Sequence, residues 1–148
     1  MRALLILSML AVVVPDREDQ TPKEKAKPIQ QQILCDWQLV QSVRGGRPDH
    51  QKDAMDAVLT FTAGEIQITE NGKRQDRDDA VYTLDLTKKP VAIDITPKRG
   101  NERKIEGILK LEGDQLTICF TLDGPRPTEF TTRGEKVIAL MQLRRIKK

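Results

Sequence analysis

The chain has 148 residues, of which 38% are hydrophobic and 32% are charged, as expected for one soluble domain with appended segments. Its 25 basic and 22 acidic residues leave a net charge of only +3. This near balance of charges argues against a nucleic-acid-binding protein, whose basic residues gather on one face. Aromatic residues make up 3% of the chain, too few to provide the stacking platforms of proteins that bind single-stranded nucleic acid or sugars.

The N-terminal segment has the pattern of an export signal. Arg2 precedes an apolar run at 3–14, which is too short to span a bilayer as a helix, and a charged segment follows. We therefore predict a signal peptide over 1–15 and a flexible linker over 16–33, where charge and proline replace any apolar period. The protein is expected to be periplasmic or extracellular, tethered to the membrane if the signal stays uncleaved. The alternative interpretation is a buried first helix or strand.

From Asp36 onward, apolar and polar residues alternate, which is typical of half-buried strands. Trp37, Leu39 and Val43 share one phase in the first of them. The pattern predicts eight strands, at 37–43, 58–62, 65–69, 80–86, 91–96, 105–111, 116–122 and 137–145.

The links between these strands alternate in length. Short links are expected at 63–64, 87–90 and 112–114, and long links at 44–57, 70–79, 97–103 and 123–136. In an up-and-down meander, successive links lie at opposite ends, so the short turns gather at one end and the long loops at the other. Tight turns at one end and a loop-rimmed mouth at the other are typical of a small ligand-holding barrel. We predict an all-β domain over 34–148, an eight-stranded antiparallel up-and-down barrel of lipocalin-like form.

Several segments resemble a known family. "DWQLVQS" is similar to the Gly-x-Trp opening of lipocalin-like domains, with Cys35 in place of the glycine. "KKPVAIDITP", "GILKLEGDQLTICF" and "RPTEF", followed by an apolar strand that ends in arginine, resemble an uncharacterised lipocalin-like family that is abundant in secreted proteins of planctomycete bacteria. The resemblance covers about 34–146. It implies the fold and export but no reaction, because the family has no established activity.

No residue pattern predicts catalysis, a metal site or a cofactor. His50, the only histidine, lies in the polar segment "RPDHQKD" without a nucleophile or a full ligand set, and we interpret it as a solvated surface residue. Acidic pairs such as Asp78 and Asp79 are adjacent in sequence, which is no indication of two carboxylates facing each other across a cleft. Asp94, in the middle of a strand, either points to the outer face or accepts a hydrogen bond from a neighbouring loop.

The two cysteines are not expected to form a disulfide. Cys35 precedes the first strand and Cys119 lies within the seventh, so the last strand separates them by about 10 Å, beyond the reach of a disulfide at about 7 Å. A linker that folds back would be the alternative that permits a bridge.

Four residues are the candidate site and closure residues. Arg126 lies between the two prolines of "GPRPTEF", and Phe130 ends this segment, in the long loop 123–136 at the predicted mouth. One hypothesis is that Arg126 binds an anionic ligand, with Phe130 tucked over the barrel end; the other is that Phe130 fills the mouth while Arg126 pairs internally. Trp37 and Arg145 lie where the first and last strands should meet, so we expect the guanidinium over the indole ring.

The preferred function is a non-enzymatic exported binding module with a ligand site at the mouth. The alternative is a structural or protein-interaction domain with a filled barrel. The partner is then a small molecule or a protein of unknown identity; nucleic acid and a transmembrane span in the mature domain are not expected, and the chain is expected to be a monomer.

Overall fold

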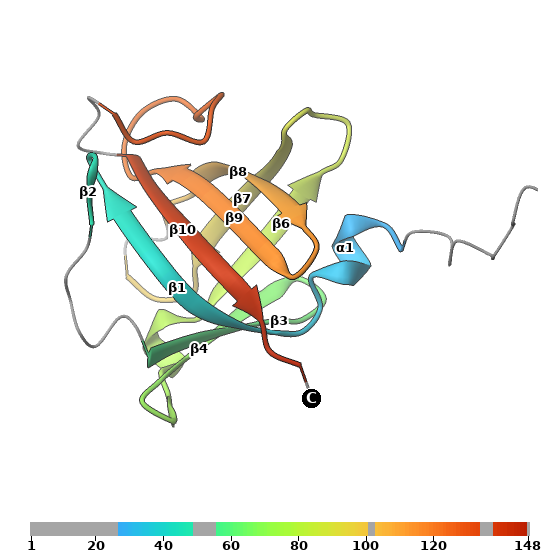
Figure 1. Ribbon diagram of the computed structural model, residues 1–148. Helices are drawn as coiled ribbons and strands as arrows, with labels where there is room; N and C mark the ends of the chain where they lie inside the picture. Colours follow the sequence, from blue (N-terminus) through green and yellow to red (C-terminus); the bar gives the residue numbers. More distant parts are fainter. Residues whose placement is uncertain (1–26, 49–55, 101–102, 134–137, 148) are drawn as a thin grey trace, which may run out of the picture.

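The structure is a computed structural model that describes residues 27–48, 56–100, 103–133 and 138–147. The predicted signal peptide, the linker up to residue 26, and His50 lie outside these residues. The described chain is almost entirely β, and eight of its strands form a closed antiparallel barrel (Figure 1). The predicted fold class is therefore confirmed.

The barrel strands follow one another around the wall in chain order. They are β1 (Asp36–Arg44), β3 (Ala57–Phe61), β4 (Glu65–Glu70), β6 (Ala80–Asp85), β7 (Val91–Pro97), β8 (Ile105–Glu112), β9 (Gln115–Thr121) and β10 (Ile138–Arg145). Two short strands lie outside it, and two short helical segments complete the described elements: β2 (Arg47–Pro48), β5 (Lys73–Arg74), α1 (Ile29–Gln32) and the 3-10 turn η2 (Asp76–Asp78).

The alternation of link lengths is also confirmed. The links at 62–64, 86–90 and 113–114 are short and lie at one end, which we call the short-turn end. The other links begin and end at the opposite, long-loop end. The tightest link joins β8 to β9 through Gly113 and Asp114, and Gly113 has φ +59°, a conformation that two-residue hairpins require and glycine adopts without steric cost.

The barrel closes where β1 pairs with β10, from Trp37 opposite Arg145 to Arg44 opposite Ala139. A β-bulge between Leu39 and Gln41 shifts the register by one residue. Such an insertion exchanges the two faces of a strand from that point on. Val43 consequently pairs with Leu140 on the outer face, so the prediction that it shares a face with Trp37 is wrong.

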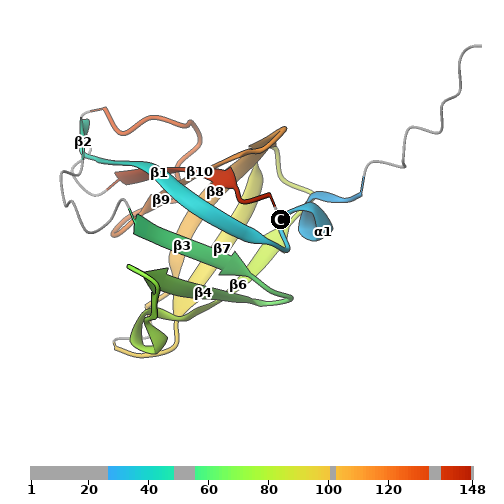
Figure 2. The same ribbon diagram turned by 60° about the horizontal axis from the view of Figure 1, so that its bottom comes forward.

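The short-turn end is covered by α1 and by the first residues of β1. Ile33 and Trp37 are fully buried, and Ile29 packs against the same core, so the predicted linker ends before residue 29. Ile29 and Ile33 are four residues apart and lie on one side of a single helical turn, which explains why so short a helix forms here. Figure 2 shows α1 beside the C-terminal end of β10.

Trp37 and Arg145 join α1 to the barrel wall. The indole Nε1 donates to the Ile33 carbonyl at 2.9 Å, and the Arg145 guanidinium carbon lies 4.6 Å from the ring centroid. Nη1 of Arg145 also donates to the Gln32 carbonyl at 2.8 Å. The guanidinium thus contacts both the indole face and the C-terminal end of α1, where a positive charge is favourable.

We expect Trp37→Ala to lower the free energy of unfolding by about 3–5 kcal/mol, because it removes a fully buried side chain at the barrel closure. Denaturant melts measure this change. Trp37→Phe is the matched control: it preserves most of the packing but removes the indole donor, and it should cost less. A loss below about 1 kcal/mol for Trp37→Ala would contradict the closed end described here.

The weakest strand pairing in the barrel is that between β4 and β6, which consists of two residue pairs. A bidentate ion pair reinforces it: Nη1 and Nη2 of Arg74 each donate to an Asp79 carboxylate oxygen at 2.5 Å. Arg74 belongs to β5, which pairs with β4, and buried Asp79 immediately precedes β6. The ion pair therefore ties the two strands together where the ladder between them is short.

The pKa of the Asp79 carboxyl is lowered, first by the hydrogen bonds from Arg74. A carboxylate with a depressed pKa stabilises the fold above its ordinary pKa of about 4, and that contribution is lost as the pH falls through the folded-state pKa. We expect Asp79→Asn to lower stability at neutral pH. Below pH ~4, the stability of this variant should fall less steeply with decreasing pH than that of the wild type. Asp78→Asn, at an exposed neighbour, is the control, and acid titrations followed by circular dichroism measure both. Identical acid profiles for wild type and Asp79→Asn would exclude this role.

Candidate functional site

The segment that joins β9 to β10 lies against the outer wall of the barrel. We call its described residues, 122–133, the strap; Figure 1 draws it in orange to red beside β8 and β9. Ile93 of β7 and Leu109 of β8 belong to the core, so these two side chains mark the inner face of their strands. Asp94, Ile108 and Lys110 alternate with these and face outward; the strap contacts Asp94 and Lys110, and Ile108 lines the same depression as residues of the strap.

Arg126 is the central contact of the strap. Its Nη1 donates to two backbone carbonyls, of Ile93 at 3.0 Å and of Gly107 at 2.7 Å, and its Nη2 donates to Oδ1 of Asp94 at 2.5 Å. The carbonyls belong to neighbouring strands, because Ile93 pairs with Gly107. A planar guanidinium with several fixed donors is suited to such a site, whereas a lysine ammonium is not.

Two further charges complete this arrangement. Glu106 lies opposite Asp94 in the β7–β8 ladder, 3.7 Å from the Arg126 guanidinium. The ammonium group of Lys104 lies 3.8 Å from Asp94 and 3.6 Å from Glu106. Two cations therefore face two carboxylates, so the formal charges of the cluster sum to zero and the positive charge of Arg126 is balanced within it.

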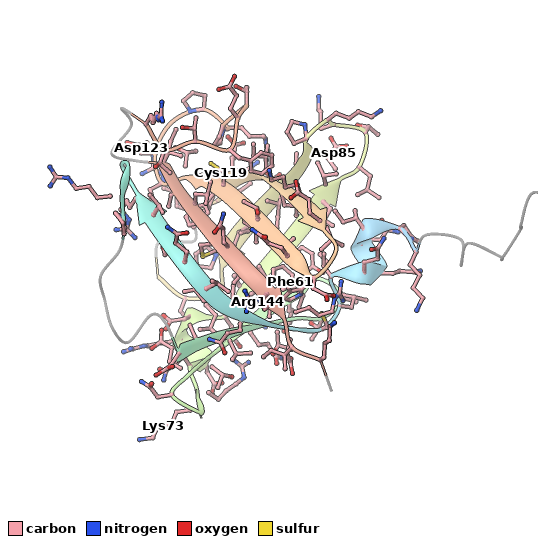
Figure 3. The ribbon with its side chains drawn as sticks, in the orientation of Figure 1. Phe61, Lys73, Asp85, Cys119, Asp123 and Arg144 are labelled. Carbon is pink, nitrogen blue, oxygen red and sulfur yellow. The ribbon has the colours of Figure 1, made fainter. Side chains whose placement is uncertain are left out.

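The strap buries residues that would otherwise be exposed on the outer wall. Ile108 is 2% exposed and Cys119 is fully buried, although both face outward. The Cys119 sulfur lies 3.9 Å from the Thr131 carbonyl, and Figure 3 shows this side chain near the strap. Burial raises the pKa of the Cys119 thiol, which disfavours the reactive thiolate. Both cysteines are free, as the strand geometry predicted.

Phe130 does not lie over the barrel end. Its ring is partly buried on the outer wall, with the Lys110 ammonium 4.8 Å from the ring centroid. Both hypotheses placed Phe130 at the mouth, and the structure corrects them on this point. The internal pairing of Arg126 was anticipated as one alternative, but its partners lie on the wall. The strap lies against the wall because the acceptors of the Arg126 guanidinium are there, whereas the apolar inner side chains offer no comparable set of acceptors.

We expect Arg126→Ala to lower the free energy of unfolding by about 1–3 kcal/mol, since it removes the guanidinium hydrogen bonds to Asp94 and to two backbone carbonyls. Arg126→Lys should recover only part of this loss. Arg133→Ala, an exposed arginine in the same strap, is the matched control and should be close to neutral. Thermal melts that show equal midpoints for Arg126→Ala and Arg133→Ala would rule out the role of Arg126 in anchoring the strap.

Between the strap and the β6–β7 link lies a depression that we call the outer groove, with a volume of about 410 Å³. Thr83, Asp85, Lys88 and Lys89 line one side, and Arg126, Pro127 and Thr128 line the other. Its base is formed by the outward-facing residues Ala92, Asp94 and Ile108, together with Leu84 and Pro90.

Among the described residues, the inner face of the barrel is a continuous apolar surface. Four inner side chains near the long-loop end are only partly buried and pack against the core; we call Ile68, Ile95, Phe120 and Met141 the mouth cluster. They come from β4, from β7 and from the neighbouring strands β9 and β10. Beside them, Gly107 permits close strand approach, because a Cβ there would lie 2.7 Å from the Cys119 carbonyl and 2.9 Å from Cβ of Phe120.

Arg126 and Asp94 are thus brought together, as are Trp37 and Arg145, while Phe130 lies apart from the mouth. Within the described residues, no cluster of three or more His, Cys, Asp or Glu is placed to bind a metal ion. The same part of the chain contains no helix with the length and hydrophobicity needed to cross a membrane.

Comparisons with known proteins found no relative. No family model matches the chain, and neither a curated protein nor a solved structure matches it. Inferences about function therefore depend on the geometry of the barrel and on the sequence.

Proposed function

We propose that this chain is an exported, non-enzymatic binding module that accepts a small apolar ligand at the long-loop end of its barrel. The observation that carries the proposal is the mouth cluster, four apolar side chains that face inward from four strands and keep part of their surface exposed. Partly exposed apolar surface inside a concave wall is the usual lining of a small-molecule site.

Inner side chains are partly buried at both ends, since Leu84, Val91 and Leu111 beside the short turns are as well, but only the short-turn end is covered by α1, and this favours entry from the mouth. At the short-turn end, Ile33 and Trp37 are fully buried and the Arg145 guanidinium covers the indole. The strap, which was expected over the mouth, is held to the outer wall by Arg126. Neither Arg126 nor Phe130 is therefore part of the proposed mouth site.

Export is supported by the sequence alone. Arg2 and the apolar run at 3–14 have the features of a signal peptide, and we propose membership of the lipocalin-like family that 34–146 resembles, whose members are secreted. Residues 1–15 should then be absent from the mature protein or anchor it to a membrane. Mass spectrometry of fractionated cells checks this; intact protein confined to the cytosol would contradict it.

A filled barrel that serves as a structural or protein-interaction domain is the second candidate. The observation that favours it is the continuity of the core, in which buried inner side chains from every barrel strand form one cluster with Ile33 of the α1 segment. Under that proposal the mouth cluster is simply the outermost layer of the core, and it would take up no ligand.

Neutral N-phenylnaphthylamine, whose fluorescence rises in apolar surroundings, separates the two candidates. We expect saturable binding to the wild type, and affinity about three- to tenfold weaker for Met141→Gln, which makes one mouth side chain polar at nearly constant volume. Val81→Thr is the matched control, because Val81 is an exposed apolar residue of β6, 41% exposed, on the outer face. Its affinity should equal that of the wild type.

The filled-barrel candidate predicts a different result. The wild type would then show no saturable rise in fluorescence, or Met141→Gln would bind the probe as well as Val81→Thr does. Either result would refute a ligand site at the mouth. Circular dichroism spectra of both variants establish that the fold is intact, so that a loss of binding is not a loss of structure.

A further inference from the structure

We propose that the outer groove is a second binding site, separate from the barrel interior, that takes a compact organic anion: a carboxylate, sulfonate or phosphate ester on an apolar body. The groove lies between the β6–β7 link and the strap, with a volume of about 410 Å³. That size is within the range of sites for small organic molecules and is too small for a folded partner.

Apart from Asp94, the base of the groove is apolar. Ala92 is 6% and Ile108 is 2% exposed, and Pro127 of the strap is buried beside them. These residues come from β7, β8 and the strap, and the Arg126 contacts described above hold the three elements together. A preformed base of this kind binds the apolar body of a ligand without first having to be ordered.

The two sides of the groove differ in charge. On the strap side, Arg126 and Lys104 face Asp94 and Glu106, so this side is neutral. On the β6–β7 side, Lys88 and Lys89 are exposed, and no carboxylate of a described residue lies within ion-pair distance of either ammonium group. The unbalanced positive charge of the groove is therefore carried by these two lysines.

Asp85, the last residue of β6, is the remaining charged residue of the lining, and its pKa is lowered first by hydrogen bonds from Thr87 of the link and then by the positive charges of Lys88 and Arg126. Oδ1 accepts from the backbone N–H of Thr87 at 3.0 Å and from its hydroxyl at 2.6 Å. Figure 3 shows Asp85 at the β6–β7 link. With one carboxylate against two lysines, this side of the groove keeps a net positive charge. This charge selects an anion over a cation or a neutral ligand.

Two probes that share one aromatic body test the proposal. Anilinonaphthalene sulfonate carries the anionic group, and N-phenylnaphthylamine lacks it. We expect the Lys88→Gln/Lys89→Gln double variant to bind the sulfonate about five- to thirtyfold more weakly than the wild type, and the difference to shrink at high salt. Binding of the neutral probe should not change, because the lysines lie outside the barrel.

The matched control is the Lys27→Gln/Lys73→Gln double variant, which removes the same charge from exposed lysines that do not line the groove. It should bind the sulfonate as the wild type does. Thr83→Phe adds bulk to the groove without changing its charge, and it should also weaken sulfonate binding. None of these residues belongs to the Arg126 cluster, so the strap stays in place.

Amide chemical shifts locate the bound sulfonate. We expect perturbed signals at Thr83, Ala92 and Thr128, which line the groove, and unperturbed ones at Ile95 and Phe120. Three results would each overturn the proposal: no saturable sulfonate binding by the wild type, an equal loss in the two lysine double variants, or perturbations confined to the mouth cluster. The last of these would still support the mouth site, so the two proposals fail independently.

Discussion

Closure of the sheet between β1 and β10 is the constraint on which the rest of this structure depends. The two strands lie at opposite ends of the described sequence, and their pairing removes both edges of an eight-stranded sheet at once. Closure encloses one apolar interior, and the Trp37–Arg145 contact lies at one end of this ladder. It also leaves the strap no strand edge to pair with, so its polar groups need partners elsewhere.

Arg126 determines where the strap goes. Its guanidinium donates hydrogen bonds to two carbonyls and one carboxylate on the wall of β7 and β8. These contacts hold the strap against the outside of the barrel. The consequence for function is a separation of surfaces. The inner face retains a partly exposed apolar cluster, while the strap and the β6–β7 link enclose a groove with a positively charged side. The two surfaces differ in the ligand chemistry they can accept, because one is apolar throughout and the other is not.

The barrel wall is not equally strong around its circumference. Most neighbouring strands share five or more residue pairs, but β4 and β6 share two, and the Arg74–Asp79 ion pair joins them beyond the end of that ladder. Charge-assisted contacts thus hold the chain in two places where backbone pairing does not reach, at this junction and beneath the strap. Both contacts use the arginine fork, which can bind two acceptors in one plane.

Local sequence patterns were sufficient for the strands, the links and the closure, because alternation and link length are properties of neighbouring residues. They also predicted Trp37 opposite Arg145, since phase along each strand follows from counting. They missed the β-bulge in β1, which inserts a residue without a distinctive sequence signal and moves Val43 to the outer face. They also missed the helical turn α1, whose two apolar residues are too few to show a period.

The position of Arg126 and Phe130 was decided only by the tertiary structure. The prolines of the segment indicate stiffness, but they do not say against which surface a stiff segment packs. That depends on acceptors from Ile93, Asp94 and Gly107, which are distant in sequence and lie within reach of one guanidinium only after β7 and β8 have paired. The sequence by itself therefore determined the barrel and its phase, whereas the course of the strap, and with it the outer groove, depended on contacts that exist only in the folded chain.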